Sequence, residues 1–131
     1  MKEVTHEEQE REAWRAGVVT RMHISARNGA TQLCIFEQWI APDAGAPAHH
    51  HPVEEVLTVI AGEAELWIAD ERIVLAGGHS LIVPAHAQHG FRNCGSTPLH
   101  MRGILASPVF EAIIEGELMR RWEAEDQPTP T

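Results

Sequence analysis

Residues 45–62 read Gly-Ala-Pro-Ala-His-His-His-Pro-Val-Glu-Glu-Val-Leu-Thr-Val-Ile-Ala-Gly. This stretch gathers three histidines and two glutamates just before an apolar segment that is typical of a β-strand. On an extended chain His49 and His51 point to the same side, and Glu55 has the same parity. Imidazole nitrogens and a carboxylate directed to one point favour binding of a metal ion.

Two neighbouring residues compete with these candidates for the same role. Glu54 has the opposite parity to His49 and His51, so we expect its side chain to face away from the site. His50 also points away from its two histidine neighbours, and we expect it to be solvated. The stretch therefore offers three candidate ligands.

Short segments rich in β-forming residues alternate with turn residues along most of the chain. Turns recur about every eight to ten residues, which favours an all-β antiparallel sandwich or barrel. Residues 41–47 contain two prolines and a glycine and are expected to form a loop. The expected strands are 18–25, 31–40, 55–60, 63–69, 72–75, 80–83, 89–93 and 99–105.

The length of 131 residues is consistent with one compact domain. Residues 1–16 are polar and are expected to form an N-terminal arm, with either a short helical turn or no regular structure. Residues 17–123 form the expected β-domain with its C-terminal extension. Within it, residues 107–123 fit a helix or a strand, and we favour mixed structure anchored by Trp122. We expect residues 124–131 to form a disordered tail.

Charge and composition exclude several classes of protein. The net charge is −9 and the ten Lys and Arg residues are scattered, so we expect no nucleic-acid partner. No apolar run has the length of a membrane span and no signal peptide is visible, so we expect no membrane association and a cytoplasmic location. Cys34 and Cys94 are too few for a disulfide framework and are expected to be reduced.

A second patterned stretch, residues 78–93, changes the interpretation of the first. Together the two stretches resemble the two motifs of the cupin superfamily. The first motif, G-x5-H-x-H-x3,4-E-x6-G, is matched at His49, His51, Glu55 and Gly62, with Gly45 nearer His49 than the motif has its first glycine. The second motif, G-x5-P-x-G-x2-H-x3-N, is matched at Gly78, Pro84, His89 and Asn93. His86 stands where this second motif has its second glycine. The resemblance is close over residues 45–93 and looser over about 17–105.

The resemblance implies an all-β cupin fold, which is a double-stranded β-helix or jelly-roll barrel, with short helical or irregular terminal segments. It implies metal ligands at His49, His51, Glu55 and His89. Three imidazoles and one carboxylate suit a single divalent Fe, Mn, Ni, Zn or Cu ion, and we prefer Fe or Mn. Four protein ligands on an octahedral ion leave two positions open, as in a catalytic site.

Parity also suggests which residues line the pocket beside this site. Leu57 and Val59 share the parity of Glu55, and Phe91 shares that of His89. We place His86 near the mouth of the site. Catalytic residues remain unassigned, with Glu55 and His86 as the main candidates. Glu37 is a further acid–base candidate, and for residues 98–106 the pattern does not show which parity faces the pocket.

Cupins include enzymes of several kinds, storage proteins and ligand-sensing domains, so the resemblance does not specify the activity. Our leading hypothesis is a metal-dependent enzyme, dioxygenase-like and similar to the quercetin dioxygenase group, that acts on a small oxygenated molecule. The alternative is a non-catalytic cupin module that binds a metal or a small molecule. Val56, Thr58 and Ile60 make the second face of their strand partly apolar, so we also expect a homodimer.

Overall fold

The computed structural model describes residues 1–125. The tail that was expected to be disordered, residues 124–131, lies largely outside this range. Strands make up nearly all of the regular structure, apart from two short 3-10 turns, η1 (His6–Glu8) and η2 (Ala26–Asn28). The strands are β1 (Arg11–Arg15), β2 (Val18–Ile24), β3 (Cys34–Ile40), β4 (Gly45–His50), β5 (Glu55–Ala61), β6 (Glu63–Ile68), β7 (Glu71–Ala76), β8 (His79–Val83), β9 (His89–Asn93), β10 (Leu99–Leu105), β11 (Phe110–Ile114) and β12 (Glu117–Arg121).

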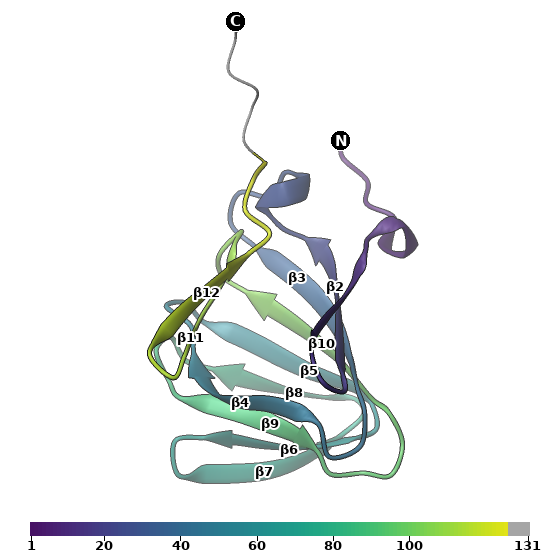
Figure 1. Cartoon of the computed structure of the whole chain (residues 1–131), viewed down its shortest axis with the longest axis vertical. Helices are drawn as coiled ribbons and strands as arrows, with labels where there is room; N and C mark the ends of the chain where they lie inside the picture. Colours follow the sequence, from purple (N-terminus) through teal and green to yellow (C-terminus); the bar gives the residue numbers. More distant parts are fainter. Residues whose placement is uncertain (126–131) are drawn as a thin grey trace, which may run out of the picture.

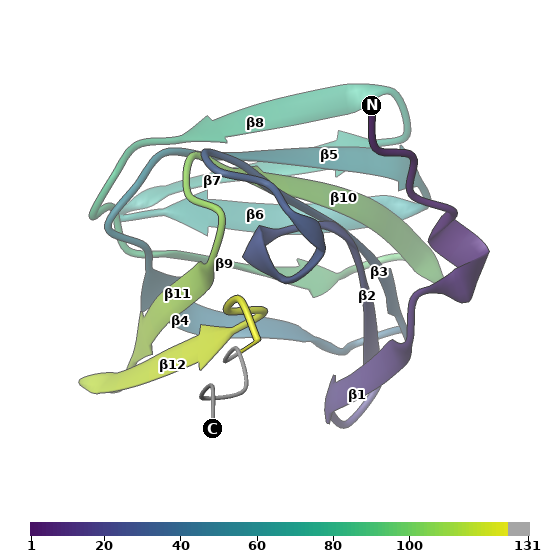
Figure 2. The same cartoon turned by 90° about the horizontal axis from the view of Figure 1, so that it is seen from above.

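Two antiparallel six-stranded sheets face each other (Figure 1). Sheet A has the strand order β1-β2-β3-β10-β5-β8, and sheet B has the order β12-β11-β4-β9-β6-β7. The chain crosses repeatedly from one sheet to the other, which is the connectivity of a jelly roll. β1 and β12 are the edge strands on the same side of the two sheets (Figure 2). The all-β jelly-roll prediction is confirmed.

Alternation along each strand separates an inner face from an outer face. In β10, Leu99, Met101 and Leu105 are buried, while His100 and Arg102 lie on the outer face. This answers the question of parity that the sequence left open. Close packing requires glycine at position 103, because a Cβ atom there would lie 2.3 Å from the Phe36 ring.

Buried apolar side chains between the sheets form two clusters. One cluster lies between β5, β6, β9 and β10, and it includes Val59, Leu66 and Met101. The other contains Phe36, Phe110 and Trp122 together with residues of β2, β10 and β11. The Phe110 ring lies 5.4 Å from the ring of His51, so this second cluster adjoins the candidate ligands.

Three segments differ from the prediction. Residues 41–47 were expected to be a loop, but β4 begins at Gly45; Pro47 falls at the irregularity between Ala46 and His49 in the pairing of β4 with β9, where a missing N–H is tolerated. Residues 107–123, expected to be mixed structure, contain the hairpin β11–β12. Glu115 and Gly116 form its two-residue turn, and both have the positive φ that a type I′ turn requires. Residues 11–15, within the expected arm, pair with β2 as an edge strand.

Among the described residues, no helix has the length and apolar character needed to cross a membrane.

Candidate metal centre

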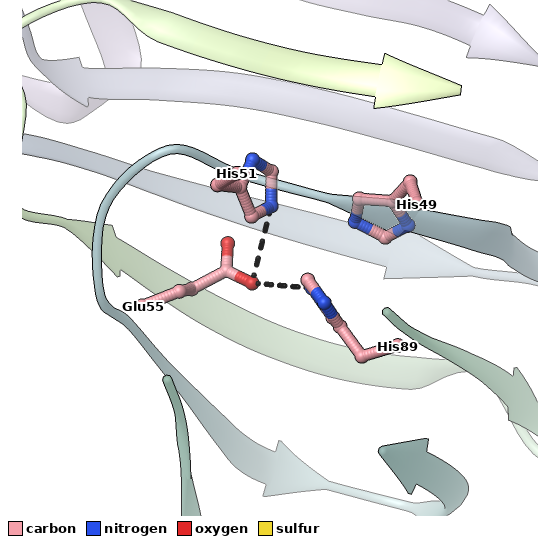
Figure 3. A group of neighbouring side chains, drawn as sticks. All are labelled: His49, His51, Glu55 and His89. Carbon is pink, nitrogen blue, oxygen red and sulfur yellow. Dashed lines mark hydrogen bonds and ion pairs between the residues drawn. The ribbon is translucent and has the colours of Figure 1, made fainter. Parts of the chain in front are cut away.

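The four predicted ligands come from both sheets and meet between them (Figure 3). His49 in β4 and His89 in β9 are directly paired across sheet B. His51 follows β4, and the chain then crosses to sheet A, where Glu55 begins β5. All four side chains are buried, and their potential ligand atoms lie within 4.8 Å of one another.

Backbone carbonyls orient the three imidazoles. The Nδ1 atoms of His49, His51 and His89 lie 2.7, 2.6 and 2.8 Å from the carbonyl oxygens of Pro47, Glu111 and Ala87, respectively. A carbonyl oxygen only accepts hydrogen bonds, so each Nδ1 carries the proton and donates it. Each Nε2 atom is therefore the one left to bind a cation.

The Nε2 atoms of His51 and His89 face Glu55, and this arrangement fits a metal ion. Glu55 Oε1 lies 3.1 Å from Nε2 of His89 and 3.4 Å from Nε2 of His51. The Nε2 atom of His51 is buried and has no hydrogen-bond partner among the described residues. Imidazole lone pairs and a carboxylate oxygen that converge in a buried space require a cation, either protons or a metal, to balance them.

The ionisation of these groups follows from their burial and their contacts. Burial, with His89 close by, lowers the pKa of His49 to about 4, so this ligand is neutral at pH 7. Burial would lower the pKa of His51, but contact with Glu55 outweighs it and raises that pKa. Burial would likewise raise the pKa of Glu55, but His51 and His89 lower it to about 2. Glu55 is therefore an anion that attracts either a proton or a metal to the neighbouring imidazoles.

The residues rejected by parity lie outside this cluster. Glu54 is exposed. His50 is turned away from the ligands, and its Nδ1 lies 2.9 Å from the side-chain amide of Gln88. The structure thus separates alternate residues of the histidine stretch as expected for a strand.

A cavity adjoins the ligand cluster. It has about 30 Å³ of space open to water, far less than the roughly 300–1,000 Å³ of typical ligand pockets. Leu57 and Phe91, two of the expected pocket residues, are among the residues that line it. The remaining lining residues are Trp14, Arg15, Val18, Phe36, Gln38, Ala46, His49, His51, Glu55, Phe110, Ala112, Ile114 and Met119.

Three candidates are not part of this cavity and are corrected. Val59 is fully buried in the apolar core instead. His86 is exposed; its φ of 67° lies in the left-handed region, which explains why the motif has glycine there. Glu37 faces the outer side of sheet A, where it contacts Arg21, His23 and His100.

Sequence reasoning missed several residues that line the cavity, most of them in the two edge hairpins, β1–β2 and β11–β12. Gln38 was detectable, because it shares the parity of Phe36 on β3. Arg15 and Met119 carried no such signal, because they lie in segments that were expected to be an arm and mixed structure. They reach the cavity only because β1 and β12 are edge strands on the same side of the two sheets.

The profile of the family described as cupin domain matches residues 36–106, more than half of the chain. This chain is a cupin. A solved RmlC-like cupin from Shewanella frigidimarina NCIMB 400 is 25% identical and superposes with a TM-score of 0.68, covering 79% of this chain and 87% of that one. Oxalate decarboxylase from Bacillus subtilis, a protein with Mn(II) centres, is 21% identical with a TM-score of 0.75, covering 82% of this cupin and 30% of that chain.

Among curated proteins, this cupin is similar to Auxin-binding protein 1 from Arabidopsis thaliana. The two are 25% identical over 99 residues, which make up 69% of this cupin and 50% of that protein. The chain therefore spans about half the length of this curated relative. These likenesses establish the fold, and the function has to be argued from the site.

Proposed function

We propose that this cupin is a metal-dependent, dioxygenase-like oxidoreductase that acts on a small oxygenated molecule. The observation that carries the proposal is the buried set of His49, His51, Glu55 and His89, whose ligand atoms converge beside a cavity. A structural zinc site is usually closed by its ligands, whereas a site that opens onto a cavity can admit a further ligand.

The donor set favours one divalent transition metal. Three imidazoles and one carboxylate suit Fe or Mn, and the Mn(II) centres of oxalate decarboxylase, which has the same fold, support this preference. When bound, such an ion polarises a substrate oxygen and supplies redox chemistry. The chain itself holds the imidazoles through backbone carbonyls, so the ligand positions exist before a metal binds.

The walls of the cavity support a small substrate held away from water. Leu57, Phe91 and Phe110 surround the ligand set with apolar side chains. In such a setting, polar contacts to a substrate are stronger than they are in water. The restricted space limits the substrate to a few non-hydrogen atoms unless the edge hairpins move.

Metal analysis followed by oxygen uptake tests the proposal. Protein from metal-replete cells, without an affinity tag, is expected to contain about one transition metal per chain. His49→Ala and Glu55→Ala should lose the metal, because each removes a ligand, whereas His50→Ala serves as the matched control and should retain it. Oxygen consumption with a panel of small diketones and thiols then tests turnover. No metal in the parent protein, or equal metal content in all variants, would contradict the proposal.

A second candidate is a non-catalytic binding module. The narrow cavity and the likeness to a protein named for binding auxin favour it. A binding module would retain the metal and bind a panel compound in calorimetry without consuming oxygen or changing the compound. Product formation by the metal-loaded protein would exclude this candidate.

A further inference from the structure

Arg15, the last residue of β1, is a cation that lines the same cavity as His49, His51 and Glu55. Its side chain is half-buried. Its hydrogen bonding among residues 1–125 amounts to one contact, from Nη1 to the carbonyl oxygen of Gly45 at 3.4 Å. A guanidinium has five N–H donors, so most of the donors of Arg15 have no partner in the described part of the chain.

Other arginines of this cupin are paired or exposed. Arg21, Arg92 and Arg121 lie within 4 Å of the carboxylates of Glu37, Asp43 and Glu12. Arg11 and Arg102 are exposed to water. Arg15 combines partial burial with the absence of a carboxylate partner among the described residues. Its free N–H donors can therefore pair with an anion that enters the cavity.

The charge around the cavity also favours an anionic ligand. Glu55 is the one carboxylate among the described residues that line it. A divalent ion, Glu55 and Arg15 together carry a net charge of about +2. An anion that entered the cavity would be attracted by both the ion and the guanidinium, and Arg15 would meet it with a planar pair of donors.

We propose that Arg15 is the anion-binding residue of this site and that the substrate class is a small carboxylic acid, whose carboxylate pairs with Arg15 beside the candidate metal ligands. This inference rests on the proposed function, since it assumes that the ligand enters beside a bound metal. The guanidinium fork matches a carboxylate through two parallel hydrogen bonds. The small cavity restricts the acid to a few carbon atoms.

Calorimetric titration with acetate tests the assignment, using Mn(II)-loaded protein and acetamide as the neutral probe of the same shape. Arg15→Gln is expected to weaken acetate binding at least about tenfold while acetamide binding stays unchanged, because only the anion gains from the guanidinium. Arg15→Lys retains the charge and should recover part of the affinity. Arg11→Gln, on the same strand but exposed, is the matched control and should bind acetate as the parent does.

The outcomes separate this inference from the proposed function. Equal acetate affinity in the parent and Arg15→Gln, with one metal in each, overturns the arginine assignment and leaves the metal proposal intact. Absence of metal from the parent overturns the metal proposal; titration of the metal-free proteins then decides whether acetate binding depends on Arg15. If acetate binds neither the metal-loaded nor the metal-free protein, the assignment of Arg15 is overturned. Circular dichroism and thermal unfolding show whether Arg15→Gln is folded. If it is not folded, the acetate affinity of the parent is compared with that of Arg15→Lys instead.

Discussion

At the scale of single residues, the histidines of the site are positioned by the backbone and not by other side chains. Each of the three ligand imidazoles donates its Nδ1 proton to a carbonyl oxygen. Two of these carbonyls, of Pro47 and Ala87, lie two residues before the histidine that they orient. For these two histidines, the local conformation that places the side chain also selects its tautomer, whereas His51 depends on the carbonyl oxygen of Glu111 in β11.

Glu37 is the second strongly shifted acid of the chain, and it lies on the outer face of sheet A. Burial alone would raise the pKa of Glu37, but hydrogen bonds from His23, His100 and Arg21 lower it to about 2. A carboxyl group whose pKa is lower in the folded state stabilises the fold fully above its unfolded pKa of about 4.5. This stabilisation is lost as the pH falls through the folded value of about 2.

We predict that Glu37→Gln destabilises the protein at pH 7 and that its stability deficit shrinks as the pH falls from about 4.5 towards 2. Urea unfolding of the parent and the variant at a series of pH values measures this. Glu65→Gln is the control, because Glu65 pairs with an exposed arginine, Arg72. A deficit for Glu37→Gln that does not change with pH would contradict the assigned role.

At the scale of elements, the two edge hairpins are joined by aromatic side chains. Trp14 of β1 and Trp122, which follows β12, have ring centroids 5.2 Å apart. Both indole N–H groups donate to Glu12, at 3.3 and 2.7 Å. Trp14 also lines the cavity. The contact between the hairpins therefore closes one side of the site.

We predict that Trp122→Ala lowers the free energy of unfolding by about 3–5 kcal/mol, because it removes a buried indole and leaves a cavity. Thermal or urea unfolding measures the change. Leu118→Ala, in the exposed part of β12, is the matched control and should change stability by no more than about 0.5 kcal/mol. Similar stability of the two variants would show that Trp122 does not anchor the C-terminal hairpin.

At the scale of the whole molecule, an apolar row crosses the outer face of sheet A. The strand pairing aligns Ile24, Ile35, Ile104, Val56 and Ile82 on five neighbouring strands. Ile82 is 64% exposed and ends the row on the edge strand β8. The homodimer expected from the sequence stays a prediction, and this row is the surface on which we expect the second copy to dock.

Analytical ultracentrifugation of the parent is expected to give the mass of a dimer. Ile82→Lys and Ile104→Lys should shift it towards the monomer, because they place charges within the apolar row. Val74→Lys, at an exposed position on β7 of the other sheet, is the control and should remain dimeric. A monomeric parent, or a dimer that persists in both row variants, would exclude this interface.

Much of the fold and most of the ligand set were predictable from local pattern. β9 and β10 have the predicted boundaries, and in β10 the alternation of Leu99, Met101 and Leu105 with other residues explains this. The inward direction of His49 and His51 followed from parity within one stretch. Parity does not extend to Glu55, because the chain crosses from sheet B to sheet A before it, so Glu55 and His89 were indicated by the two motifs. His86, in an exposed turn, and Glu37, on the outer face of sheet A, show the limit, since chemistry that suits a site does not show where a side chain lies.

The sequence by itself determined the strand pattern, the inward residues of the histidine stretch and the chemical class of the ligands. These properties depend on neighbours a few residues apart, where parity and turn preference act. Only the tertiary structure decided that Arg15 and Met119 reach the cavity and that Trp14 meets Trp122. Those contacts join segments about a hundred residues apart, and the order of strands in the two sheets, not local preference, brings them together.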